Sequence, residues 1–322
     1  MKKCILFLVL ASAQLIPEAA LAQQAPAADQ NFAYLVTFGK KAERSWGDDD
    51  FVQIFFFSVP QVCNQAVYLR VYDPDVGGKV DENRGGFNTK TKFTVYGGTG
   101  AHSDPAARKH EPVGNYKSGI QLATKTFDGE ATWDEKWYTF GPFSPIEGEL
   151  QPEFGGYIFK IVIEGIEGDD GNLYKMFLSS KKEENVDMEG GNSFTYEFCL
   201  RVPDNAGTVC HIYPFVSSRV IAVKTSIFDY DSEGFIRTVS VAKKGDVFRP
   251  GGDGNWVEHT HVIVEDEYNT SLDIQFVKQA AVKNNNIAVY ITNQYGDLLP
   301  FYTVPIGGVP RYKYKIGIKA GK

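Results

Sequence analysis

Short runs of apolar and aromatic residues recur along the whole chain between turn signals, and this spacing limits the fold more than any other feature. In the run VYLRVY at 67–72, apolar residues alternate with Tyr and Arg, which is the period of two expected for a half-buried strand. No window of a dozen residues has the i, i+3, i+4 apolar spacing of an amphipathic helix. The chain therefore predicts an all-β protein.

The composition agrees with this fold class. The 322 residues include 32 glycines, which turns favour, and 14% are Phe, Tyr or Trp, which pleated sheets favour. With 43% hydrophobic and 23% charged residues, the chain is typical of a globular protein. Its formal net charge of −7 argues against a nucleic-acid partner, because phosphate binding needs a basic surface. The charge is compatible with divalent cations or neutral glycans.

The first 22 residues have the three parts of a secretory signal peptide. Lys2 and Lys3 form a positive start, residues 4–15 form an apolar run, and the sequence ALA at 20–22 forms a small-x-small cleavage site. The apolar run is too short to span a bilayer. We expect cleavage after Ala22, no transmembrane anchor, and a periplasmic or secreted protein.

The remaining chain divides at a turn. The sequence PDNAG at 203–207 is rich in turn-forming residues, and about six or seven short strands follow it, which is the content of an immunoglobulin-like sandwich. We expect a disordered lead over 23–31, a β-sandwich over 32–202 and an immunoglobulin-like β-sandwich over 203–322. The predicted architecture is two tandem antiparallel β-sandwiches of jelly-roll or immunoglobulin-like type. The two halves show no clear internal repeat in sequence.

Three cysteines remain after cleavage: Cys63, Cys199 and Cys210. The predicted compartment permits disulfides, and an odd number of thiols leaves at most one intramolecular bridge. A clip across the 203–207 turn and a bridge from Cys63 to Cys199 both remain open, and we expect a disulfide that involves Cys199. The spacing lacks the further thiols or histidines of a zinc site.

Two segments resemble parts of known exported domains. The sequence FFFSVP at 55–60, followed by VYLRVYDPD at 67–75, is similar to the strand pattern of secreted prepeptidase-C-terminal-type sandwiches. The hairpin VKTSIFDYDSEGFIR at 223–237 resembles one in the immunoglobulin-like domains of exported bacterial proteins. These resemblances imply a β-sandwich fold and an accessory or interaction role, and they transfer fold more than function.

An acidic loop follows the strand at 67–72. The sequence DPDVGG at 73–78 and the aspartate three residues later place Asp73, Asp75 and Asp81 in one loop. Calcium binds such oxygen ligands, and a weak extracellular site needs only two or three carboxylates plus carbonyl groups. The two interpretations of this loop are a calcium site and plain solvated charge. The run DDD at 48–50 either contributes to it or keeps a loop soluble.

A second acidic turn copies the opening of a calcium loop. Asp229, Asp231 and Glu233 alternate before Gly234, as they do at the start of an EF-hand. The twelfth position is Ser240 instead of the bidentate glutamate, and both flanks are strand-like. A plain hairpin turn is therefore the favoured interpretation of this segment, with calcium as the alternative.

The sequence HTHVIVE at 259–265 is the sharpest pattern in the chain. On a strand, His259, His261 and Glu265 share one face, so they are candidate ligands for a transition metal such as Zn, Fe, Mn or Ni. The pattern resembles the first motif of the cupins, with Gly254 one residue nearer than that motif requires. The second cupin motif is incomplete, because no histidine follows His261.

An ordinary half-buried strand is the interpretation that we favour for the same segment. In it, the residues between the candidate ligands face a core and the histidines and glutamate face water. The core-facing residues would be Thr260, Val262 and Val264.

Two tryptophans are candidate contacts for a glycan. Trp133 and Trp137 lie four residues apart, and aromatic rings on a sandwich face stack on sugars. Burial in a core is the alternative, which we favour for most aromatic residues of this chain. The long connection at 97–114 contains His102 and His110, and a loop of this length is typical of a functional or a mobile segment.

These features predict an exported, non-enzymatic binding or interaction protein with an adhesion, envelope-structural or glycan-recognition role. Its partner would be an extracytoplasmic protein or a glycan. The sequence contains no G-x-S-x-G elbow, H-E-x-x-H or P-loop motif, so no catalytic residue is assigned. The alternative is a metal-dependent enzyme of cupin-like type, in which His259, His261 and Glu265 hold a metal that activates water or substrate.

Overall fold

The computed structural model describes residues 23–231 and 234–313. The predicted signal peptide lies outside the described residues, as does Glu233. The described chain is all-β, and its helical segments are single 3-10 turns of three or four residues. This confirms the predicted fold class. Within the described ranges, no helix is long and apolar enough to cross a membrane.

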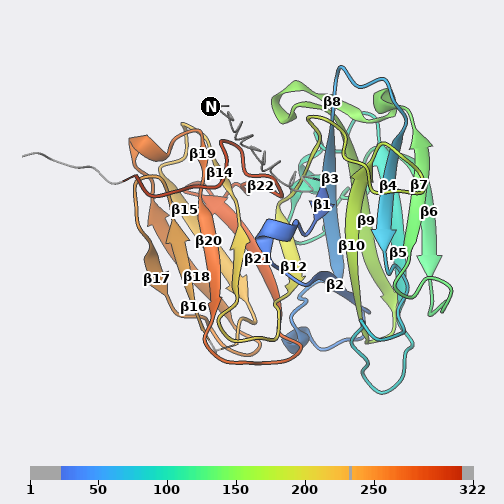
Figure 1. Ribbon diagram of the computed structural model, residues 1–322, viewed down its shortest axis with the longest axis horizontal. Helices are drawn as coiled ribbons and strands as arrows, with labels where there is room; N and C mark the ends of the chain where they lie inside the picture. Colours follow the sequence, from blue (N-terminus) through green and yellow to red (C-terminus); the bar gives the residue numbers. More distant parts are fainter. Residues whose placement is uncertain (1–22, 232–233, 314–322) are drawn as a thin grey trace, which may run out of the picture.

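The largest sheet runs through both halves of the chain (Figure 1). Its nine described strands have the order β18-β15-β21-β12-β2-β10-β4-β7, and β1 adds to β10. All described pairs are antiparallel. The strands are β1 (Gln24–Ala25), β2 (Tyr34–Phe38), β4 (Val67–Tyr72), β7 (Trp137–Phe143), β10 (Gly171–Ser179), β12 (Glu197–Arg201), β15 (Ala222–Phe228), β18 (Trp256–Val262) and β21 (Asn286–Asn293).

Three smaller sheets complete the described part of the fold. A seven-stranded sheet contains β3 (Val52–Pro60), β5 (Lys90–Gly97), β6 (Ile120–Phe127), β8 (Glu149–Gln151), β9 (Gly156–Glu167), β11 (Asn192–Thr195) and β22 (Phe301–Tyr302). A four-stranded sheet contains β13 (Val209–Ile212), β16 (Gly234–Val239), β17 (Asp246–Phe248) and β20 (Asp273–Lys278), and β14 (Phe215–Val216) pairs with β19 (Thr270–Ser271). The 3-10 turns are η1 (Ala28–Gln30), η2 (Arg44–Trp46), η3 (Pro105–Arg108), η4 (Pro145–Glu147), η5 (Pro152–Phe154) and η6 (Glu265–Glu267).

Strand β3 shows why the sequence at 52–59 is nearly all apolar. Phe55 and Phe57 face the main core between the sheets, and Phe56 faces a second apolar cluster on the opposite side. Because both faces are buried, the period of two disappears from the sequence. The Phe55 ring packs 5.4 Å from the ring of Phe198, which lies 5.2 Å from that of Phe301. Each such fully buried ring contributes about 1.5–3 kcal/mol by its removal from water.

Strand β12 joins the two halves. Leu200 pairs with Leu35 of β2 on one side, and Cys199 pairs with Ala288 of β21 on the other. In Figure 1, β12 and β21 lie between the strands of the first half and those of the second. A β-sandwich fold is present, and a division into two tandem domains at residues 203–210 stays a prediction.

Two local predictions differ from the structure. Residues 23–31, expected to be a disordered lead, form β1 and η1, because Ala25 pairs with Met176 at the edge of β10 and is fully buried. The predicted disulfide is not formed, since Cys63, Cys199 and Cys210 are all free thiols.

The two thiols that flank the 203–207 turn lie in different sheets, β12 and β13. The Cys199 Sγ lies 3.0 Å from the Gly47 carbonyl oxygen, and the Cys210 Sγ lies 3.2 Å from that of Asn31. The turn therefore does not bring the thiols together.

Candidate metal centres

The first acidic loop gathers three carboxylates, one of which comes from a distant part of the sequence. Oxygen atoms of Asp73, Asp75 and Asp134 all lie within 4.8 Å of one another. Asp73 follows β4 and has a φ of 55°, and its backbone N–H donates to the carbonyl of Lys136 at 2.8 Å. The Asp73 Oδ1 accepts the backbone N–H of Glu135 at 3.1 Å. The pairing of β4 with β7 thus brings residue 134 beside the predicted loop.

Asp75 is the unusual member of this cluster. Its side chain is 0% exposed, and neither carboxylate oxygen has a hydrogen-bond partner. Burial and then the charge of Asp134 raise the pKa of Asp75 to about 7. Burial, followed by repulsion from Asp134 and Glu135, raises the pKa of Asp73 to about 6. An ionised carboxylate in such surroundings is costly unless it is paired, so the cluster favours a proton or a bound cation.

Asp81, the third predicted ligand, holds the loop together. One of its oxygens accepts the backbone N–H of Gly77 at 2.7 Å, and the other accepts that of Leu173 at 2.6 Å. Burial raises its pKa well above the ordinary value, with further repulsion from Asp73 and Asp75. It is not a member of the group within 4.8 Å, in which Asp134 is the third carboxylate.

The second acidic turn has the same arrangement. Oxygen atoms of Asp229, Asp231 and Asp253 lie within 4.8 Å of one another. Asp229 follows β15 with a φ of 60°, its N–H donates to Asn255 at 3.2 Å, and its Oδ1 accepts the N–H of Gly254. Burial first, and then repulsion from Asp231 and Asp253, raises its pKa to about 7. Glu233, predicted as a ligand here, lies outside the described residues.

The two acidic clusters are built in the same way, each from a pair of antiparallel strands: β4 with β7, and β15 with β18. Each third aspartate stands three residues before a tryptophan, in DEKW at 134–137 and DGNW at 253–256. Trp137 pairs with Tyr72 in register, and Trp256 pairs with Phe228, so each tryptophan faces the residue before the first aspartate. The ring centroids are 5.4 Å and 5.2 Å apart. The repeated D-x-x-W sequence is the signal that could have identified Asp134 and Asp253.

The clusters differ in exposure. Asp253 is exposed and Asp231 is half-buried, whereas Asp75 is fully buried in the first cluster. Water therefore solvates part of the second cluster, and the demand for a cation is stronger in the first.

The structure does not bring the predicted transition-metal ligands together. His261 is 1% exposed, with its Nε2 3.0 Å from Glu267 Oε1 and its Nδ1 3.2 Å from Asp246 Oδ2. His259 stacks on Phe248 at 4.4 Å, and Glu265 is exposed at the start of η6. Within residues 23–231 and 234–313, the groups of three or more ligand side chains within 4.8 Å consist of aspartates alone.

The favoured interpretation of the histidine strand is corrected in part: Glu265 is exposed as expected, but the histidines face inward and the residues between the candidate ligands are exposed. Val262 and Val264 are 61% and 40% exposed, and Thr260 is exposed as well. The histidines face inward because β17 and η6 cover that side and supply partners for both rings. Burial alone would raise the pKa of Glu267. Hydrogen bonds from His261 and Ser240 outweigh this effect, so the pKa of Glu267 lies below its ordinary value.

We expect His261→Ala to destabilise the protein by about 2 kcal/mol, because it removes one of the hydrogen-bond donors to the buried Glu267 carboxylate. Urea denaturation measures this change, and elemental analysis of the same samples should show an unchanged zinc and manganese content. Thr260→Ala, an exposed change on the same strand, should stay within about 0.5 kcal/mol of wild type. A fall in bound transition metal for His261→Ala would restore the enzyme hypothesis.

The two candidate glycan-binding tryptophans have separate surroundings. Trp133 packs edge-on against Phe127 and Tyr138 beside the main core, and its Nε1 donates to Glu130 at 3.2 Å. Trp137 lies beside Tyr72 and under the guanidinium of Arg70. Both side chains are half-buried and do not form one platform.

Comparisons with known proteins add little to this geometry. The chain matches no family model and no curated protein. It is similar to a chain in the solved structure of the Macrobrachium rosenbergii nodavirus, with 10% identity over 91% of this chain and 98% of that chain. The TM-score of 0.16 is too low to support an argument on fold or function.

Proposed function

We propose that this protein is an exported, non-enzymatic binding or interaction protein whose fold is completed by calcium. The observation that carries the calcium assignment is Asp75, a fully buried carboxylate with two unpartnered oxygens between Asp73 and Asp134. Calcium takes several oxygen ligands in a flexible geometry, and carboxylates and carbonyl groups of loops supply them. A cation at this position pairs the buried charge and relieves the repulsion within the loop.

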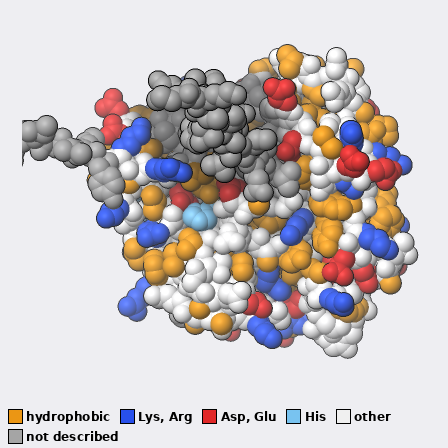
Figure 2. Space-filling view, in the orientation of Figure 1, with side chains coloured by type: hydrophobic (Ala, Val, Ile, Leu, Met, Phe, Trp, Pro, Cys, Tyr) orange, Lys and Arg blue, Asp and Glu red, His pale blue; other side chains and the backbone are white. Residues whose placement is uncertain are grey.

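The surface next to the clusters supports a binding role. Trp137 is half-buried and Trp256 is 38% exposed, and each stands beside one acidic cluster. Exposed aromatic rings are common contacts for glycans and proteins, because they offer a large apolar area at a small entropic cost. On the face drawn in Figure 2, acidic and basic side chains are interspersed, without the continuous basic patch that a nucleic acid needs. These features support an extracytoplasmic protein or a glycan as partner.

Calorimetric titration of chelator-treated protein with calcium tests the assignment. We expect binding with a Kd on the order of 10⁻⁴ to 10⁻³ M, the range of extracellular modules. Asp75→Asn should bind one equivalent less than wild type, because it removes the buried charge that the ion neutralises. The matched control is Asp128→Asn, the same change at an exposed aspartate, which should bind like wild type. Equal binding by wild type and Asp75→Asn would contradict the calcium assignment.

The binding role has its own test. A pull-down from an envelope fraction and a glycan array, each run with calcium and with chelator, should yield a partner that is retained better with calcium. Turnover of a hydrolase or dioxygenase substrate without any retained partner would show that the protein is an enzyme instead.

A further inference from the structure

The two halves of the chain share one strand order. The first half has β2-β10-β4-β7 in the largest sheet and β3-β9-β5-β6 in the seven-stranded sheet, and the second half has β12-β21-β15-β18 and β13-β20-β16-β17. Because these strands follow each other in the same order along the chain, most connections in one half have a counterpart in the other. The largest difference in length is between β5 and β6, where the connection covers residues 98–119, whereas its counterpart between β16 and β17 covers residues 240–245. A long connection of this kind on a regular scaffold is typical of a binding loop.

This long loop (residues 98–119) reaches the second half and borders a groove there. The His110 ring stacks on the Tyr290 ring of β21, with the centroids 4.1 Å apart and the planes at 9°. Two cavities of about 460 and 310 Å³ lie beside this contact, and they share His110, Thr292 and Gly296 in their linings. They therefore form one continuous groove, and their volumes fall in the usual range of ligand sites, about 300–1,000 Å³.

Two polar atoms of the shared lining have no hydrogen-bond partner. Thr292 is 6% exposed, and its Oγ1 is unpartnered, as is the buried Nδ1 of His110. Buried polar groups in folded proteins are nearly always paired, so these atoms indicate an occupant. Burial lowers the pKa of His110, which keeps the imidazole neutral with one ring nitrogen as an acceptor. A ligand hydroxyl both donates and accepts, so it can pair with either atom.

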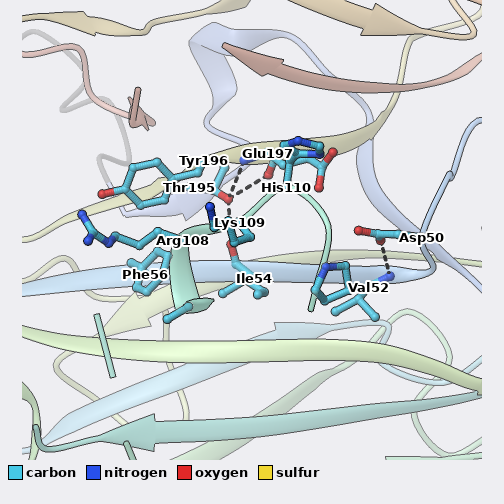
Figure 3. Close-up of a pocket in the computed structure, with 12 residues that line it drawn as sticks. Asp50, Val52, Ile54, Phe56, Arg108, Lys109, His110, Thr195, Tyr196 and Glu197 are labelled. Atoms are coloured by element: carbon cyan, nitrogen blue, oxygen red, sulfur yellow. Dashed lines mark hydrogen bonds between the residues drawn. The ribbon is translucent and has the colours of Figure 1, made fainter. Parts of the chain in front are cut away.

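The charges around the groove offset one another. Lys224 in its lining forms an ion pair with Glu258, with 2.8 Å between Nζ and Oε1. Figure 3 shows the guanidinium of Arg108 directed toward Tyr196, and both of these residues line the groove. The remaining charges carry both signs: Lys109 and Asp297 in the lining, and Glu111 next to His110. The groove therefore favours neither an anion nor a cation, and its polar groups suit a neutral ligand rich in hydroxyl groups.

Aromatic rings continue from the groove across β21 and β18. The Tyr290 ring lies 5.1 Å from that of Trp256, which is 38% exposed and packs against Phe228 at 5.2 Å. An exposed indole ring held in this way offers an apolar face on which a sugar ring stacks. A peptide would instead need apolar pockets for its side chains, and the lining of the groove consists mostly of hydroxyl, amide and charged groups.

We propose that this groove binds a neutral glycan chain, whose hydroxyl groups pair with Thr292 and His110 and one of whose sugar rings stacks on Trp256. The proposal rests on the binding role given above, and it names the class of partner and the place where that partner binds. It does not involve the calcium assignment at Asp75.

Neutral hexasaccharides of glucose, xylose, mannose and N-acetylglucosamine serve as probes, with sulfated and uronic-acid chains as the acidic comparison. Calorimetry in the presence of calcium measures binding. We expect at least one neutral hexasaccharide to bind and to change the tryptophan fluorescence, and the acidic chains to bind more weakly. Binding of acidic chains alone, of a peptide library alone, or of none of these probes would overturn the proposal. An envelope protein retained in the pull-down without any sugar binding would overturn this proposal and leave the binding role intact.

Thr292→Val tests the groove itself. It removes the hydroxyl group and keeps the shape, so it should weaken sugar binding by about tenfold without lowering the melting temperature, because the hydroxyl has no partner in the free protein. The matched control is Thr238→Val in β16, where another threonine is 1% exposed with an unpartnered Oγ1 and lies outside the groove. It should bind like wild type. Equal sugar binding by the two variants would show that the sugar binds elsewhere.

Tryptophan variants test the stacking contact. Trp256→Phe should remove most of the fluorescence change on sugar binding, because this indole ring is both the contact and the reporter. Trp137→Phe, at the matching position of the first half, should keep the change. A fluorescence change that persists in Trp256→Phe would overturn the stacking contact, and it would do so even if Thr292→Val failed to fold.

Discussion

Glu82→Ala should destabilise the protein by about 3–5 kcal/mol, because it leaves a buried arginine without its counter-charge. The side chains of Glu82 and Arg201 are 2% and 10% exposed, and they form an ion pair. Asn286 donates to the same Glu82 carboxylate at 3.1 Å and accepts from Arg201 Nε at 2.6 Å. The pair ties the first acidic loop to β12 and β21, so its loss affects both halves.

Urea denaturation monitored by tryptophan fluorescence measures this effect. Glu82→Gln should cost less than Glu82→Ala, because an amide oxygen still accepts from Asn286 and Arg201. Glu183→Ala removes a glutamate whose side chain is 80% exposed in its ion pair with Lys182, and it should change stability by less than about 0.5 kcal/mol. If Glu82→Ala behaved like Glu183→Ala, the buried pair would not hold the loop in place.

The first acidic cluster shows which part of a site sequence reasoning can miss. The pattern at 67–75 predicts a strand followed by an acidic turn, and the structure has β4 followed by Asp73 and Asp75. Asp134 was missed because its approach depends on the antiparallel register of β4 and β7, which local sequence does not specify. The repeated D-x-x-W sequence at 134–137 and 253–256 is the one sequence signal for the approach of Asp134 to the acidic loop.

Strand β12 illustrates a second limit. Its residues predict a strand, but its neighbours β2 and β21 come from opposite ends of the chain. Sequence spacing favours a boundary near residue 203, because turn residues cluster there, yet the sheet continues across that point. Non-local pairing of this kind follows from packing of the whole chain and leaves no local signal.

The histidine strand illustrates a third limit, which is the choice of face. The alternation at 256–262 was predicted, but a period of two does not reveal which side is covered. Polar residues normally face water, whereas His261 is buried because Glu267 and Asp246 surround its ring. Because Glu267 of η6 supplies a buried partner for His261, the prediction that His261 faces water, which was based on polarity alone, is wrong.

Without calcium, the stability of the wild-type protein should fall as the pH rises from about 4 to about 7. The folded-state pKa of Asp75 is raised to about 7 from an ordinary value of 3.8, so between these values the folded state holds a proton that the unfolded state has lost. Ionisation of the buried carboxylate therefore weakens the folded state as the pH rises. At about 1.4 kcal/mol per pKa unit, the loss accumulated by the time the pH exceeds 7 is at most about 4.5 kcal/mol.

Calcium should offset part of this loss, because it pairs with the ionised carboxylates and binds only the folded state. A hundredfold excess over Kd stabilises by about 2.7 kcal/mol, and the melting temperature at pH 8 should rise by a few degrees with calcium and fall with chelator. Magnesium should have a smaller effect, because it keeps its waters and requires octahedral geometry.

Asp75→Asn separates this residue from the other groups with raised pKa values. Burial also raises the pKa values of Asp73, Asp48 and Asp229, so part of the pH dependence should remain in the variant. Without calcium at pH 8, Asp75→Asn should be more stable than wild type, and it should lose most of the calcium response. Asp128→Asn should follow the wild-type curve, because its side chain is exposed. Identical melting curves for wild type and Asp75→Asn across this pH range, with and without calcium, would mean that Asp75 carries no buried charge for an ion to neutralise.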